Sequence, residues 1–148
     1  MADRTESSIV VAAAPAAVLD VIADFESYPE WTGAVKQVEI LEALPDGRGK
    51  RVRFALDAGA IRDTYVLDYD WGVDDSGVGA LSWTLEESTV LRALNGTYEL
   101  SDAPGGATNV RYELSVDLRI PMLGMLRRKA ERTIIDTALS ELKKRVEG

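Results

Sequence analysis

The chain has 148 residues and a formal net charge of −8, and it contains neither cysteine nor histidine. A domain of this length buries enough apolar surface to fold without disulfide bonds or a structural metal. The missing residue types exclude the usual zinc sites, cysteine nucleophiles, Ser–His–Asp triads and imidazole bases. We therefore expect no metal and no cofactor. Any catalysis must use the remaining acidic, basic or hydroxyl groups, or a water molecule.

The sequence carries no evident signal peptide and no membrane span. Its first residues have charges of both signs ahead of a short apolar run, which is not the pattern of a secretory signal. No window reaches the roughly 18 apolar residues that a membrane span requires. These features predict a cytoplasmic protein without stable membrane insertion.

The spacing of apolar residues predicts one strand, a helical segment, six further strands and a long final helix. Residues 4–11 form the first predicted strand. The helical segment that follows has Pro15 in its first turn and is broken at Pro29. Turn sequences rich in Gly, Asp and Pro separate the later strands, as is typical of an antiparallel meander. These six strands span residues 34–44, 48–57, 60–71, 78–86, 89–101 and 107–118.

Alternation within the strands predicts which face of the sheet is buried. In the strand 60–71, one face is apolar except for a single acid, and it carries Ile61, Asp63, Tyr65, Leu67, Tyr69 and Trp71. The final segment, 122–146, places apolar side chains at every fourth position from Leu126 to Leu142. This spacing predicts an amphipathic helix of about 25 residues, roughly 37 Å long.

Together the elements predict a single α+β domain that covers residues 1–148. The strands and the long helix must each bury one apolar face. The simplest arrangement wraps a curved antiparallel sheet of about seven strands round the C-terminal helix, with two short helices after the first strand. Such a sheet seldom closes completely on the helix, so we expect an apolar pocket between them.

This order of elements resembles the START-like (SRPBCC) superfamily, in particular its polyketide cyclase/dehydrase and lipid-transport group. Ubiquinone-binding proteins are near neighbours of that group. The resemblance is carried by "APAAVLDVIADFESYPEW" (residues 14–31), "LSWTL" (81–85), "LNGTYEL" (94–100) and the C-terminal segment from residue 116 onward. It implies a helix-grip fold whose cavity binds lipids, polyketides, quinones or similar apolar molecules. It does not imply a reaction.

Asp63 is the sharpest candidate for a catalytic group, because it is the single acid on an otherwise apolar strand face. If Asp63 lines a pocket, desolvation would suit it to acid–base chemistry or to hydrogen bonding with a ligand. The alternative is an ion pair with Arg53, or with another strand cation, at the rim of the sheet.

The other predicted pocket residues come from the inner strand faces and from the start of the long helix. Tyrosine hydroxyls there would donate to ligand oxygens, and methionines would adapt to an irregular apolar ligand. Ordinary core packing is the alternative for each of them. The predicted ligand-binding residues are Phe54, Asp63, Tyr65, Leu67, Trp83, Tyr98, Tyr112, Met122, Met125, Leu126 and Ala130.

Charge is unevenly distributed along the chain. Residues 119–148 carry a net charge of +4, which leaves −12 on the remainder. An acidic body repels nucleic acid, so no nucleic-acid partner is expected. The basic helix either meets an acidic partner or an anionic membrane surface transiently, or forms a solvated face that balances the acidic body. Alternation places Arg53 and Arg111 on the solvent side of the sheet.

The sequence leaves three functions open. The favoured one is binding or transport of a hydrophobic small molecule such as a lipid, polyketide or quinone. The first alternative is a polyketide cyclase, aromatase or dehydrase that uses Asp and Tyr residues of the pocket. A buried Asp63 facing Tyr65 or Tyr98 would favour this enzyme, and Asp63 at the rim would count against it. The second alternative is a protein-interaction module with a collapsed cavity.

Overall fold

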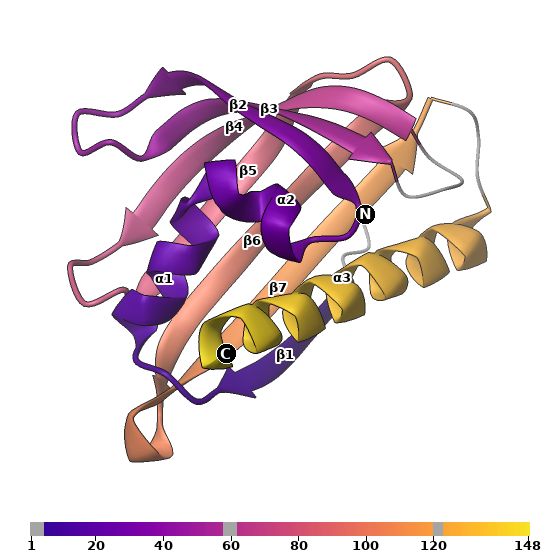
Figure 1. Ribbon diagram of the computed structural model, residues 1–148. Coiled ribbons are helices and arrows are strands. Elements are labelled where there is room, and N and C mark those ends of the chain that lie inside the picture. The colour runs from indigo at the N-terminus through magenta and orange to yellow at the C-terminus, as the bar shows by residue number, and fades with distance from the viewer. Residues whose placement is uncertain (1–4, 58–61, 120–122) are drawn as a thin grey trace.

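In the computed structural model, which describes residues 5–57, 62–119 and 123–148, a strongly curved antiparallel sheet wraps round a long helix (Figure 1). The strands of the sheet are β1 (Thr5–Val11), β2 (Val35–Ala43), β3 (Gly49–Asp57), β4 (Arg62–Val73), β5 (Gly79–Glu87), β6 (Leu91–Ala103) and β7 (Ala107–Leu118). The helices are α1 (Pro15–Ala23), α2 (Tyr28–Trp31) and α3 (Gly124–Glu147), and the 3₁₀ turns are η1 (Phe25–Ser27) and η2 (Pro104–Gly106).

The fold class predicted from the sequence is confirmed. The seven described strands follow the order β1-β7-β6-β5-β4-β3-β2. Strands β2 to β7 therefore form a meander, and the last strand, β7, also pairs with the first strand, β1. The β1–β7 ladder runs from Thr5 opposite Leu114 to Val11 opposite Thr108. The predicted strand and helix bounds agree with these elements to within about two residues, which is the usual uncertainty of element ends.

The predicted alternation in β4 is also confirmed. Tyr65, Leu67 and Tyr69 are buried on the concave face of the sheet, whereas Thr64 and Asp70, which flank this stretch, are exposed. Val66 is an exception, because it is buried although it alternates with the inner face. It lies at a bulge in the β4–β5 ladder, where the register shifts between Val66 and Leu67. The strand pattern therefore brings one aromatic-rich face toward the interior.

Helix α3 is anchored over β1 and β7 by a buried carboxylate. Glu131 is fully buried, and its two carboxylate oxygens accept hydrogen bonds from Thr5 Oγ1 and from the Val116 backbone N–H, each at 2.7 Å. The described part of the β1–β7 ladder reaches Thr5 opposite Leu114, and the Val116 N–H lies two residues farther along β7. Glu131 supplies a hydrogen-bond acceptor for this buried N–H.

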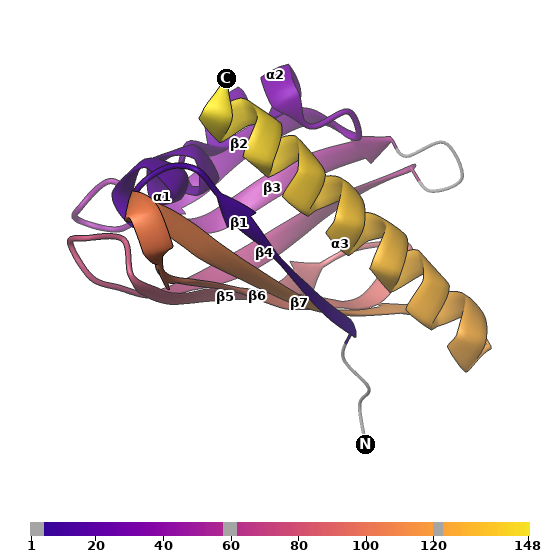
Figure 2. The same cartoon turned by 90° about the horizontal axis from the view of Figure 1, so that it is seen from below.

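Further polar contacts from α3 cover the outer edge of β1. Lys143 Nζ donates to the Val10 carbonyl oxygen at 2.8 Å, and a Glu147 oxygen accepts from the Ala12 N–H at 2.8 Å. An exposed strand edge invites pairing with other chains, so these contacts protect the edge while they fix the helix. Figure 2 shows α3 lying along this side of the sheet, with β1 beside it.

Replacing Glu131 with alanine should lower the free energy of unfolding by about 2–4 kcal/mol, because the Thr5 hydroxyl and the Val116 N–H lose their acceptors in a buried setting. Chemical denaturation followed by circular dichroism measures the loss. The control Glu131→Gln keeps one acceptor oxygen and should lose about half as much. A Glu131→Ala variant as stable as the native protein would show that this contact does not anchor the helix.

Candidate functional site: a cavity between the sheet and α3

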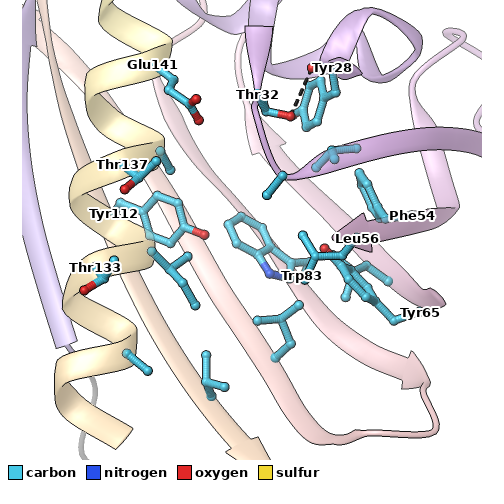
Figure 3. Close-up of a pocket in the computed structure, with 18 of the residues that line it drawn as sticks. Tyr28, Thr32, Phe54, Leu56, Tyr65, Trp83, Tyr112, Thr133, Thr137 and Glu141 are labelled. Atoms are coloured by element: carbon cyan, nitrogen blue, oxygen red, sulfur yellow. Dashed lines mark hydrogen bonds between the residues drawn. The ribbon is translucent and has the colours of Figure 1, made fainter. Parts of the chain in front are cut away.

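A cavity of about 600 Å³ lies between the concave face of the sheet, the segment from α2 to β2, and α3 (Figure 3). The sheet contributes Phe54, Leu56, Tyr65, Leu67, Tyr69, Trp83, Leu91, Leu94, Tyr98, Tyr112 and Val116. The α2–β2 segment contributes Tyr28, Trp31, Thr32, Ala34 and Val35, and α3 contributes Leu126, Lys129, Ala130, Thr133, Ile134, Thr137, Ala138 and Glu141. A mainly apolar and aromatic lining with a few polar groups is typical of small-molecule sites.

The cavity exists because α3 presents two different faces. Its buried stripe consists of Glu131, Ile135, Leu139 and Leu142, which pack over β1 and β7. The neighbouring face carries small residues such as Ala130 and Thr137 and lines the cavity. The apolar stripe expected from the sequence therefore lies mostly on the cavity side. Leu126 and Ile134, two of its members, are 54% and 37% exposed.

Three aromatic side chains form the centre of the cavity floor. The ring of Trp83 lies 5.5 Å from that of Tyr98 and 5.6 Å from that of Tyr112, and the two tyrosine rings are 4.5 Å apart. Gly96 on β6 is the register partner of Trp83. A methyl group at Gly96 would come within 2.4 Å of the indole ring. Glycine at this position therefore makes room for Trp83 against the sheet.

Several tyrosine hydroxyls are open to the cavity. The hydroxyls of Tyr65, Tyr98 and Tyr112 form no hydrogen bond to another residue in the described ranges. Every side-chain oxygen in these ranges that is shielded from solvent does have a hydrogen-bond partner. These hydroxyls must therefore contact cavity space, as Figure 3 shows for Tyr112. Tyr28 differs, because its hydroxyl donates to the Ile22 carbonyl oxygen at 2.5 Å.

Burial raises the pKa of all five tyrosines above the ordinary value of 10.0; they are Tyr28, Tyr65, Tyr69, Tyr98 and Tyr112. Interactions with neighbouring ionisable groups act in the same direction. The Asp63 charge adds to the effect of burial on the Tyr65 pKa, and Tyr28 and Glu141 add to it at Tyr98. The open hydroxyls therefore stay protonated near neutral pH and can donate hydrogen bonds to ligand oxygens.

Glu141 brings a carboxylate into the cavity lining. It projects from α3 toward the α2–β2 segment, where one of its oxygens accepts the Gly33 N–H at 3.1 Å (Figure 3). Nearby, Arg145 of α3 lies 3.2 Å from Glu30 of α2. These two contacts bridge the cavity at the C-terminal end of α3. Lys129, the other charged lining residue, is exposed and lies three turns away along the helix.

Most of the predicted ligand-binding residues lie together in the cavity lining. These residues are Phe54, Tyr65, Leu67, Trp83, Tyr98, Tyr112, Leu126 and Ala130. Met125, in the first turn of α3, is 75% exposed and is not part of the lining. Met122 falls outside the described residues.

Asp63 does not line the cavity, so the structure does not support it as a catalytic group. Its carboxylate accepts hydrogen bonds from the hydroxyls of Ser88 and Thr89, the latter at 3.1 Å. Nor does it pair with Arg53, which lies on the solvent side as expected and forms an ion pair with Glu39. Asp63 stands at the start of β4, where the adjacent β5–β6 turn reaches its carboxylate. It therefore orders this turn.

Sequence reasoning missed several polar lining residues, notably Thr133, Thr137 and Glu141. Thr133, Thr137 and Glu141 are four residues apart, and Thr133 follows the predicted lining residue Ala130 by three. These spacings place all of them on the same helix face. That spacing was the available signal. The turn aromatics Tyr28 and Trp31 also belong to the lining, with ring centroids 5.1 Å apart.

An antiparallel sheet curved round a C-terminal helix, with an apolar cavity between them, defines the START-like helix-grip class of hydrophobic ligand-binding folds. The chain belongs to the polyketide cyclase/dehydrase and lipid transport family, whose model matches residues 2–147. A comparison with curated protein sequences gave no significant match. No helix in the described ranges is long and apolar enough to cross a membrane.

Solved structures confirm the class of fold. A START superfamily protein from Mycobacterium smegmatis superposes with a TM-score of 0.89 at 19% identity, covering 97% of both chains. The Zhui aromatase/cyclase from Streptomyces sp. R1128 gives a TM-score of 0.78 at 16% identity, covering 99% of this chain and 94% of its own. A protein from Thermus thermophilus gives 0.75 at 21% identity, covering 97% of both chains. At these identities the likeness extends to the fold alone.

Alkaline titration should show no tyrosine ionising near pH 10 while the protein stays folded. The folded state holds these protons at a pH where the unfolded chain releases them, so stability is unchanged below about pH 10 and falls above it. We expect tyrosinate absorbance to appear together with loss of the near-ultraviolet circular dichroism signal. A tyrosinate signal that develops near pH 10 with the fold intact would contradict the raised pKa values.

Proposed function

We propose that this protein binds an uncharged, largely apolar small molecule that carries a few oxygen atoms, and that it acts as a binder or carrier of that molecule. The observation that carries the proposal is the cavity of about 600 Å³, with apolar walls and tyrosine hydroxyls that have no partner in the described ranges. Its volume falls within the range of roughly 300–1,000 Å³ found for small-molecule sites. Lipids, polyketides and quinones are the ligand classes that fit.

Two kinds of interaction would hold such a ligand. Transfer of its apolar surface from water into the cavity contributes about 25 cal/mol per Å² of buried area. The hydroxyls of Tyr98 and Tyr112 would donate to a carbonyl or ether oxygen, which also removes the cost of leaving these donors without partners. Glu141 would accept from a ligand hydroxyl, since only one of its oxygens receives the Gly33 N–H.

The enzyme alternative is weakened. A buried Asp63 facing a cavity tyrosine would have favoured it, and Asp63 is instead held by Ser88 and Thr89 outside the lining. The name of the Streptomyces relative describes that protein's activity, and its identity to this chain is 16%. A collapsed cavity, which the protein-interaction alternative requires, does not agree with an open space of about 600 Å³.

Filling the cavity should abolish ligand binding. Ala130 lies on the cavity face of α3, and the variant Ala130→Phe places a ring in the space that the ligand would occupy. We expect native mass spectrometry with organic extraction to find a stoichiometric apolar molecule on the native protein and none on Ala130→Phe. The control Ser140→Phe changes an exposed residue outside the lining and should retain the ligand.

The proposal fails if the native protein is empty and also binds no fatty acid, quinone or polyphenolic dye. It also fails if Ala130→Phe and the native protein bind the same molecule equally well.

Glu141 should make the cavity select against anions. A fatty-acid carboxylate buried near Glu141 meets a like charge in an apolar setting, where charge interactions are stronger than in water. The variant Glu141→Gln keeps an acceptor for Gly33 and removes the charge. We expect it to bind oleate about tenfold more tightly, equivalent to about 1.4 kcal/mol, and oleyl alcohol with little change. Competition against a fluorescent lipid measures both. Equal oleate affinity for the two proteins would show that no anion approaches Glu141.

A further inference from the structure

The N-terminal end of α3 exposes apolar side chains beside the cavity. Leu123 is 73% exposed, Met125 75% and Leu126 54%. The first fully buried residue of the helix is Glu131, about two turns farther along. Figure 2 shows this end of α3 extending beyond the strands. We call residues 123–132 the helix tip. Apolar exposure of this kind in one place marks a surface that contacts something other than water.

The helix tip is also strongly basic. Arg127, Arg128, Lys129 and Arg132 all lie within it. Its one acid, Glu131, is fully buried against β1 and β7 and adds nothing to the exposed surface. The tip therefore presents cations interleaved with exposed apolar side chains, on a chain whose residues before 119 carry a net charge of −12.

We propose that the helix tip docks on the surface of an anionic lipid bilayer. Leucine and methionine side chains partition into the boundary between headgroups and acyl chains, while arginine and lysine stay with the lipid phosphates. A protein groove would be matched by one continuous apolar stripe. On the helix tip, exposed apolar and basic residues alternate within two turns. A planar lipid bilayer can contact both kinds of side chain at the same time.

The acidic body does not oppose this docking, because the helix holds much of it away from the surface. The 24 residues of α3 extend about 36 Å, whereas exposed charges are screened within about 8–10 Å at physiological salt. Along α3 itself, the charges nearest the bilayer are those of the tip. The C-terminal end of α3, with its contacts to Val10 and Ala12, lies at the far end of the helix.

Docking through the tip brings one end of the cavity to the bilayer. Leu126, Lys129 and Ala130 belong to both the helix tip and the cavity lining. An apolar molecule would then pass between lipid and cavity without crossing bulk water. This consequence rests on the proposed function, whereas the docking itself does not.

Vesicle flotation of the full chain tests the proposal, using phosphatidylcholine vesicles with and without phosphatidylglycerol. The variant Leu123→Asp/Met125→Glu changes two exposed tip residues outside the cavity lining. Both substitutions suit a helix N-terminus, where acidic residues favour capping and the helix dipole, so the fold should be kept. The matched control Val10→Glu alters a side chain that is 51% exposed at the opposite end of α3.

We expect the native protein and Val10→Glu to bind the anionic vesicles at least about tenfold more tightly than the neutral ones, and to lose this preference in high salt. The double variant should bind anionic vesicles about tenfold more weakly than the native protein while it melts at the same temperature or higher. Native protein that floats with neither vesicle, or a double variant that binds like the native protein, would overturn the proposal.

A second copy of the chain is the other possible occupant of the tip. In that case light scattering would find a native dimer that becomes a monomer in the double variant, without vesicle binding, and the docking proposal would be overturned. Ligand occupancy measured on the same samples separates the two proposals. Retained ligand with no vesicle binding refutes docking alone, and an empty protein that still floats refutes only the proposed function.

Discussion

The buried carboxylate of Glu131 determines where the long helix lies. By accepting from Thr5 and Val116, it fixes α3 over β1 and β7 at one side of the sheet. An isolated carboxylate is costly to bury, and the two donors offset that cost only if the helix keeps this position. Ile135, Leu139 and Leu142 then bury their side chains on the same side. In this position α3 does not fill the space over the concave face of the other strands, and the cavity lies there.

The shape of the cavity follows from a division between large and small residues. The sheet contributes aromatic side chains, including Trp83, which pairs across the strands with Gly96. The cavity face of α3 contributes small side chains such as Ala130 and Thr137. Had the helix carried leucines at those positions, they would fill the space, because protein interiors pack to crystal-like density. The cavity is therefore encoded in the composition of one helix face.

Much of this arrangement could be predicted from the sequence, because side chains alternate regularly along strands. Alternation assigned Tyr65 and Leu67 to the inner face, and both line the cavity. Alternation also put Asp63 on that face. A period of two shows which face a residue lies on, but not how close it is to the end of the strand. Asp63 lies at the start of β4, beside Ser88 and outside the cavity. Helix rotation was harder to predict. Glu131 and Glu141 resemble solvent-facing residues in sequence, and only tertiary contacts show that one anchors the helix while the other lines the cavity.

The two ends of α3 are held unequally, and this inequality gives the cavity a direction. At the C-terminal end, Glu141 contacts Gly33 and Arg145 contacts Glu30, so polar links join the helix to α2 and its following segment. At the N-terminal end, no residue before Glu131 is fully buried. Segments with little buried surface open locally at the lowest free energy. Separation of the helix from the sheet should therefore begin ahead of Glu131, and under the proposed function a ligand would enter and leave beside Leu126 and Ala130.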